Sequence, residues 1–196
     1  MKKIPTLFVR DENDRKHVTH EVNPGCEWVL AGEGQATRKY DGTCVMYDGE
    51  RWWARREVKP GKISPPSWRH VESDTTTGKS VGWEPVEQSA FAKWHEQAID
   101  GIAEQEEGTY ELIGPKVNGN PEGEQAHRLV AHALADVLDI PDRSYDALAG
   151  FLAAAPAMEG IVFHHEDGRM VKIKRRDFPA NADSSLSENS AEAEPS

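Results

Sequence analysis

The chain has 196 residues, of which 37% are hydrophobic, and this is enough apolar mass for one domain with its own core. A mean hydropathy of −0.70 and the lack of a long uncharged apolar run argue against a membrane span. The first residues do not resemble a secretory signal, so we expect a cytoplasmic protein.

The net charge of −11 is unevenly distributed. Bases gather in 38–69 and again in 169–176, whereas acids dominate 84–111 and the end of the chain. Because the local field decides phosphate binding, the two basic stretches remain compatible with a partner that carries phosphates. The polar, acidic end predicts one domain over 1–180 and a disordered acidic tail over 181–196.

Six strands are predicted from β-branched and aromatic residues, over 27–31, 43–47, 51–55, 109–113, 160–164 and 170–174. Asp48-Gly49 and Asp167-Gly168 each predict a hairpin with a two-residue type I′ turn, because Asp-Gly tolerates the positive φ angles of that turn. Cys26 and Cys44 lie in apolar runs without metal-ligand spacing and are interpreted as buried thiols.

Helical periodicity of apolar residues predicts one helix over 91–102 and a second over 129–138, which stops before Pro141. Ser144 is the expected N-cap of a third helix. These helices interrupt the strand series without alternating with every strand. The pattern therefore favours an α+β fold with mainly antiparallel sheets and flanking helices.

Lys39 lies in the sequence Lys39-Tyr40-Asp41-Gly42, at the entry of the predicted strand 43–47. A lysine amine with the reference pKa of about 10.4 is protonated at neutral pH, so a nucleophilic lysine needs cationic neighbours or burial to depress that pKa. A basic pocket at a strand edge would supply both. The alternative is an ordinary charged turn that leads into a strand.

The last predicted hairpin brings charged residues together. With a two-residue loop, Phe163 would oppose Lys172 and Ile161 would oppose Lys174, so that both lysines share a face with these apolar residues. Glu159 would extend the same face. Fixed positive charge beside a carboxylate able to hold Mg²⁺ suits phosphoryl or nucleotidyl transfer. The alternative is a solvated face with weak ion pairs.

In this order, Lys39-Tyr40-Asp41-Gly42, Glu111, Glu159-Gly160-Ile161-Val162 and Val171-Lys172-Ile173-Lys174 resemble motifs of the covalent nucleotidyltransferases, the polynucleotide ligases and mRNA capping enzymes. The similarity is greatest to ATP-dependent RNA ligases, especially the 5′-to-3′ family that includes a vertebrate member. The resemblance covers roughly 26–178, and it implies a nucleotidyltransferase (ligase adenylation) domain.

That resemblance also implies the roles of individual residues. Lys39 would form a lysyl-AMP bond with ATP, and Thr37 would lie near the adenine. Arg55 and Glu111 would contact the ribose. Glu159 would bind Mg²⁺ or Mn²⁺, and Lys172 and Lys174 would bind phosphates.

The resulting hypothesis is an RNA ligase that transfers AMP from its lysine to an RNA 5′-phosphate and joins that end to a 3′-hydroxyl. Two alternatives remain, a DNA ligase or capping-type enzyme, and a nucleotide- or RNA-binding module without catalysis. No segment after Phe178 resembles the C-terminal domain of DNA ligases and capping enzymes. The histidines lack metal-ligand spacing, so structural or surface roles are expected for them.

Overall fold

The computed structural model describes residues 2–102 and 104–179; the predicted tail lies outside the described residues. The strands are β1 (Phe8–Arg10), β2 (Val18–Val22), β3 (Gln35–Lys39), β4 (Thr43–Tyr47), β5 (Trp52–Val58), β6 (Arg69–Ser73), β7 (Ser80–Pro85), β8 (Gly108–Ile113), β9 (Arg128–Ala131), β10 (Val137–Leu138), β11 (Gly160–His164) and β12 (Met170–Lys174). The α-helices are α1 (Glu27–Leu30), α2 (Ala92–Ile99) and α3 (Tyr145–Ala154), with short 3-10 turns η1 (Val86–Gln88), η2 (His132–Leu134) and η3 (Arg175–Asp177).

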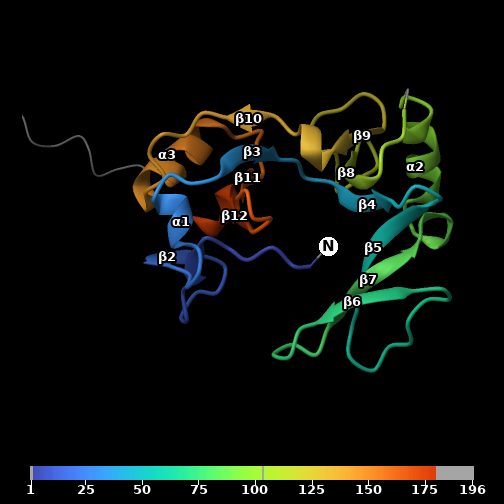
Figure 1. Cartoon of the computed structure of the whole chain (residues 1–196), viewed down its shortest axis with the longest axis horizontal. Helices are drawn as coiled ribbons and strands as arrows, with labels where there is room; N and C mark the ends of the chain where they lie inside the picture. Colours follow the sequence, from blue (N-terminus) through green and yellow to red (C-terminus); the bar gives the residue numbers. More distant parts are fainter. Residues whose placement is uncertain (1, 103, 180–196) are drawn as a thin grey trace, which may run out of the picture.

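Two larger antiparallel sheets lie side by side (Figure 1). One has the strand order β10-β3-β11-β12, and the other has the order β6-β7-β5-β4-β8-β9. The chain passes from the first sheet to the second between β3 and β4, and β1 pairs with β2 in a separate small ribbon. The mainly antiparallel α+β arrangement is thus confirmed, with few helices, whereas the nucleotidyltransferase fold remains a prediction.

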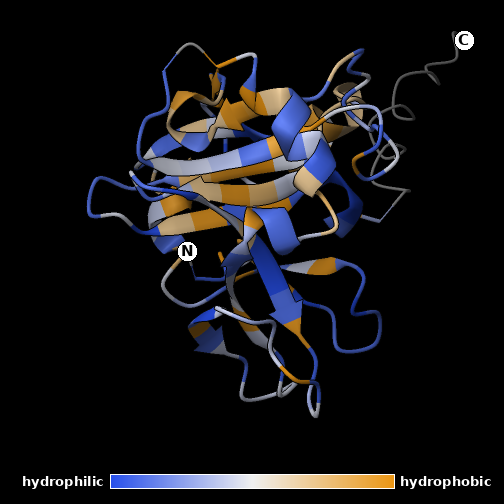
Figure 2. Ribbon diagram, turned by 90° about the vertical axis from the view of Figure 1, so that its right-hand side faces the viewer, coloured by the Kyte–Doolittle hydropathy of each residue, from blue (hydrophilic) through white to orange (hydrophobic). Residues whose placement is uncertain are grey.

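The four-stranded sheet has one apolar face. Ala36, Ile161, Phe163, Val171 and Ile173 are buried with residues of α1 and α3 in the largest core cluster. Since side chains alternate along a strand, residues 35, 37 and 39 of β3, and 172 and 174 of β12, face the other way. Apolar segments are concentrated on strands and helices, and the connecting loops are largely hydrophilic (Figure 2).

The six-stranded sheet packs α2 against its outer face. Val45, Trp52 and Tyr110 form a core cluster there with residues from η1 and the end of α2. The Tyr110 hydroxyl donates to the carbonyl of Glu106 at 2.6 Å, so this ring belongs to the core. The residues that alternate with this cluster point toward the other sheet.

Two predicted elements are wrong. Residues 27–31, predicted as a strand, contain the single-turn helix α1, whose Trp28 and Val29 are buried. Residues 129–138, predicted as a helix, contain β9, η2 and β10. In the second case Val130 pairs with Glu111 of β8, so sheet pairing overrides a weak helical period.

The predicted hairpin loops are also wrong: the last loop is one residue longer than predicted, and the first is displaced by one residue along the chain. β11 and β12 pair Val162 with Lys172 and Gly160 with Lys174, because the connection is a three-residue loop with Gly168 at φ +88°. In the first hairpin Tyr47 pairs with Trp52, which places Gly49 and Glu50 in the loop. The two lysines of β12 therefore share a face with Gly160 and Val162, and not with Ile161 and Phe163.

The other predicted elements are confirmed. Strands 160–164 and 170–174 have the expected bounds, and α2 occupies most of the first predicted helix. Ser144 caps α3 by accepting from the backbone N–H of Ala147. Among the residues that the structure describes, no helix has the length and apolar character to cross a membrane.

Gly160 permits the close approach of β11 and β12. A Cβ atom at this position would lie 2.2 Å from the carbonyl oxygen of Ile173 and 2.8 Å from the Cα of Lys174. We expect Gly160→Ala to destabilise the protein by about 1–3 kcal/mol, because backbone must move to relieve the overlap. Gly150→Ala in α3, where nothing lies within 4 Å of a new Cβ, should be neutral or stabilising by about 0.5–1 kcal/mol. Urea unfolding of both variants would check this, and equal stabilities would contradict it.

Candidate functional site

A cavity of about 560 Å³ lies between the two sheets and is called the large cavity below. Its volume is in the range of pockets that hold small ligands and cofactors. Five of the seven predicted site residues line it: Thr37, Lys39, Arg55, Glu111 and Lys172. They come from β3, β5, β8 and β12, so chain segments far apart in sequence build one site.

The N-terminal segment covers part of the large cavity. Lys3 and Ile4 line it, and Thr6 forms a parallel bridge with Lys172. Lys3 also forms an ion pair with Asp74 at 3.5 Å, just beyond β6. The segment thus spans from the edge of the four-stranded sheet to the far edge of the other (Figure 1).

The two other predicted site residues, Glu159 and Lys174, do not line the large cavity. Glu159 links Lys174 to Lys39, which does line it. Its Oε2 accepts from Nζ of Lys39 at 2.5 Å, and its Oε1 accepts from Nζ of Lys174. Sheet register explains the meeting, since Lys39, Gly160 and Lys174 lie in one row across three strands. The convergence that the sequence predicted is present, although the predicted register is wrong, because Glu159 precedes β11 and is not bound by its alternation.

The charges in this row shift two pKa values. Burial acts to raise the pKa of Glu159, but the two lysine ammonium groups outweigh burial and hold it below its usual range. Burial, and then the positive charges of Lys174 and Lys39, lower the pKa of Lys172 to about 8. Lys172 and Arg55 form no ion pair within residues 2–102 and 104–179, so the cavity has unneutralised positive charge.

Glu111 is held at the opposite side of the cavity by two contacts. Its Oε1 accepts from the backbone N–H of Gly42 at 3.1 Å, and its Oε2 lies 3.0 Å from Nε2 of His132. The other nitrogen of His132 contacts the hydroxyl of Thr109 at 2.9 Å. The sequence analysis did not single out His132, because it predicted a helix over 129–138. The available signal was the strand predicted over 109–113, with which the residues just before His132 pair.

Thr37 contacts a second histidine that the sequence did not single out. Its Oγ1 lies 3.0 Å from Nε2 of His164 and 3.3 Å from the carbonyl oxygen of Val162. Burial, and then the charge of His132, lower the pKa of His164. A neutral imidazole and a hydroxyl therefore line the large cavity together, and this polar, uncharged lining suits a nucleobase.

The loop of residues 114–123, called the clamp loop, fixes the turn after Lys39. The amide nitrogen of Asn118 donates to Oδ1 of Asp41 at 3.1 Å and to the carbonyl of Gly42 at 2.7 Å. The carboxylate of Glu122 accepts from the guanidinium of Arg38 at 2.5 Å and from the backbone N–H of Asp41 at 2.8 Å. Arg38 and Asp41, which flank Lys39 and Tyr40, are therefore both held by the buried carboxylate of Glu122.

The sequence motifs did not predict the contacts of the clamp loop. Lys116 of this loop does not line the large cavity. Asn118 has a positive φ of 47°, and this turns its side chain back toward Gly42. No group of three or more metal-ligating side chains occurs within residues 2–102 and 104–179.

Comparison with known proteins shows a similarity over part of the chain. Residues 95–187 match the family model described as RNA ligase 1. This range includes Glu111, Glu159, Lys172 and Lys174, and it begins after Lys39.

Curated vertebrate proteins named RNA ligase 1 are similar to this chain. The zebrafish (Danio rerio) protein is 35% identical over 81 residues, which is 38% of this chain and 25% of that protein. The mouse (Mus musculus) and rat (Rattus norvegicus) proteins are each 28% identical over 160 residues, which is 64% of this chain and 46% of those proteins. The chain thus spans less than half the length of these relatives. The similarity agrees with the resemblance to RNA ligases that the motifs indicate.

The Glu122 contacts should contribute to stability. We expect Glu122→Ala to destabilise the protein by about 1–3 kcal/mol, because the guanidinium of Arg38 and the N–H of Asp41 lose their partner. The matched control is Glu124→Ala, which removes a more exposed pair with Arg128 and should change stability by less than about 1 kcal/mol. Chemical denaturation of both variants would measure the difference, and similar losses would contradict the special position of Glu122.

Proposed function

We propose that this chain is an ATP-dependent RNA ligase that carries AMP on Lys39. One observation carries the proposal: Lys39 lies at the wall of a nucleotide-sized cavity, next to Lys172, Lys174 and Arg55 and in contact with Glu159. The similarity to proteins named RNA ligase 1 supports RNA as the substrate.

In the first step, Nζ of Lys39 attacks the α-phosphorus of ATP. A P–N bond forms, the bond to the β-phosphate oxygen breaks, and pyrophosphate leaves. Lys39 must first leave its contact with Glu159 and lose a proton, because an ammonium group has no free electron pair. Lys172 and Arg55 stabilise the negative charge that develops on the phosphates.

In the second step, an oxygen of the RNA 5′-phosphate attacks the phosphorus of lysyl-AMP. A P–O–P linkage forms, the P–N bond breaks, and Lys39 recovers its electron pair and takes up a proton. In the third step, an RNA 3′-hydroxyl attacks the activated 5′-phosphate: a phosphodiester bond forms, the P–O–P linkage breaks, AMP leaves with the bond electrons, and the hydroxyl proton passes to solvent. Thr37 and His164 are proposed to face the adenine, and Glu111 the ribose.

The donor set fits Mg²⁺ bound mainly by substrate. Mg²⁺ is commonly held by one or two carboxylates with phosphates and waters, and it needs no cage of protein ligands. Glu159 supplies such a carboxylate, and Lys39 and Lys174 are its present partners. When bound, the cation would neutralise phosphate charge and compete with the lysines for Glu159.

A covalent adduct tests this function directly. Intact-protein mass should show the addition of one AMP after incubation with Mg²⁺ and ATP, but not GTP, once protein adenylylated during expression has been discharged with pyrophosphate. Lys39→Ala should abolish the adduct, and Lys93→Ala, an exposed lysine of α2, should retain it. An adduct with GMP would indicate a capping-type enzyme. No adduct with either nucleotide would reject catalysis and leave a binding module.

Nucleotide binding should depend on the charge of Lys172. Because the pKa of Lys172 is about 8, its ammonium form is lost as the pH rises from 7 to 9. We expect the affinity of the protein with Lys39 intact for a non-reactive α,β-methylene analogue of ATP to fall by roughly tenfold over this range, the value of one charge-assisted contact.

Lys172→Arg in the same background is the control, because arginine stays charged and should flatten the profile. Calorimetric titration at each pH would provide the affinities. If the affinity fell equally with pH with and without Lys172→Arg, Lys172 would not contact the nucleotide.

A further inference from the structure

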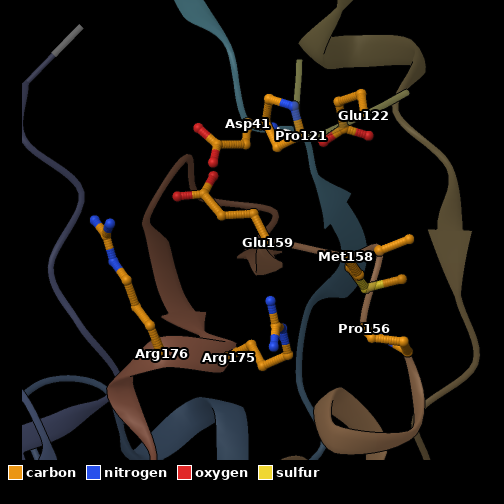
Figure 3. A pocket seen from close by; sticks show the side chains of 9 residues that line it. Asp41, Pro121, Glu122, Pro156, Met158, Glu159, Arg175 and Arg176 are labelled. Carbon is orange, nitrogen blue, oxygen red and sulfur yellow. Dashed lines mark hydrogen bonds between the residues drawn. The ribbon is translucent and has the colours of Figure 1, made fainter. Parts of the chain in front are cut away.

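A second cavity, of about 120 Å³, lies against Glu159 and is called the small cavity. Its lining includes Asp41, Glu122, Glu159, Arg175 and Arg176 (Figure 3). Lys39 lines the large cavity, and Glu159 lines the small one. The ion pair between these two residues therefore forms the boundary between the cavities.

The acidic groups of the small cavity already have partners. Glu159 is bound by two lysines, and Glu122 is bound by Arg38 and by the N–H of Asp41. Asp41 accepts from Asn118. The carboxylates are thus engaged within the protein.

The two arginines are the available groups. Arg175 and Arg176 are exposed, and neither side chain forms an ion pair or hydrogen bond with any residue that the structure describes. The backbone N–H of Arg175 donates to the carbonyl of Glu159 at 2.9 Å, which fixes this arginine beside the boundary. Together with the partners Arg38, Lys39 and Lys174 they make five cations, against the four carboxylates of Asp41, Glu122, Glu159 and Asp136, an excess of one positive charge.

We propose that the small cavity binds the terminal 5′-phosphate of the RNA, with Arg175 and Arg176 as its ligands. This inference rests on the proposed function. A terminal phosphate is compact and doubly charged, and planar guanidinium groups can bind it through paired N–H donors. The cavity is too small for a nucleotide, and the exposed arginines leave room for the RNA chain to continue outward.

The position suits the transfer of AMP to RNA. The 5′-phosphate oxygen must reach the phosphorus on Lys39, form the P–O–P bond and displace the lysine nitrogen, which takes up a proton. A phosphate held next to Glu159 is adjacent to Lys39 because the two side chains are in contact. Pyrophosphate, the product of self-adenylylation, has related chemistry and is the alternative occupant that the experiment must separate.

The test uses the double variant Arg175→Ala/Arg176→Ala. The purified, adenylylated protein is mixed with a 5′-phosphorylated oligoribonucleotide, and the formation of adenylylated RNA is followed in a single turnover at several RNA concentrations. We expect the RNA concentration for half-maximal rate to rise by roughly tenfold or more, from the loss of charged hydrogen bonds. Self-adenylylation and its reversal by pyrophosphate should stay at wild-type rates. Lys59→Ala/Lys62→Ala, which removes two exposed lysines from the loop between β5 and β6, controls for the loss of two positive charges.

A binding measurement keeps the inference testable without catalysis. Wild type should bind the 5′-phosphorylated oligoribonucleotide more tightly than its 5′-hydroxyl counterpart, and the double variant should lose this preference while its melting temperature is unchanged. An intact preference and unchanged transfer would overturn the inference. Equal slowing of pyrophosphate reversal would assign the cavity to pyrophosphate. Absence of any AMP adduct on wild type would instead reject the proposed function, and the proposed role in AMP transfer with it.

Discussion

The carboxylate of Glu159, shared between the ammonium groups of Lys39 and Lys174, is the interaction on which the site depends. It joins β3 to β12 over Gly160, where no side chain stands between them. These three partly buried charges depend on the carboxylate, because removing Glu159 would leave two neighbouring ammonium groups without a partner. Since the pKa of Glu159 is depressed, its contribution to stability is present at neutral pH and is lost as acid protonates it.

The ion pair of Glu159 with Lys39 lies between two cavities. On one side lies a cavity large enough for a nucleotide, and on the other lies a small cavity with two arginines whose side chains have no partner within residues 2–102 and 104–179. The clamp loop holds the intervening turn through Asn118 and Glu122, so the position of Lys39 is set from outside its own sheet. Although the net charge of the protein is −11, positively charged side chains gather around the two cavities.

Local sequence predicted the elements whose signals are strong. The Asp-Gly pairs located both hairpins, and the serine before α3 located its N-cap. The predicted register of the last hairpin was wrong by one residue because its loop is one residue longer, whereas the first hairpin keeps a two-residue loop that is displaced by one position to Gly49-Glu50. β3 was missed since its sequence, Gln35–Lys39, has little β-branched or aromatic content and pairs only with distant strands.

The predicted site residues lie together because their motifs occupy neighbouring strands, which no local pattern reveals. His132, His164 and Glu122 were not predicted, since each acts through a contact with a residue more than 20 positions away. Their positions follow from sheet pairing and from the path of the clamp loop. The residues that build the large cavity and its wall could therefore be predicted from motifs, whereas their supporting contacts required the fold.

The N-terminal segment has a practical consequence for work on this protein. Lys3 and Ile4 stand at the wall of the large cavity, and Lys3 reaches across to Asp74. Any peptide fused ahead of them must leave the molecule at the mouth of that cavity. An affinity tag at this end would compete with ligands for the opening, whereas a tag placed beyond Phe178 would start from the opposite side of the four-stranded sheet's core.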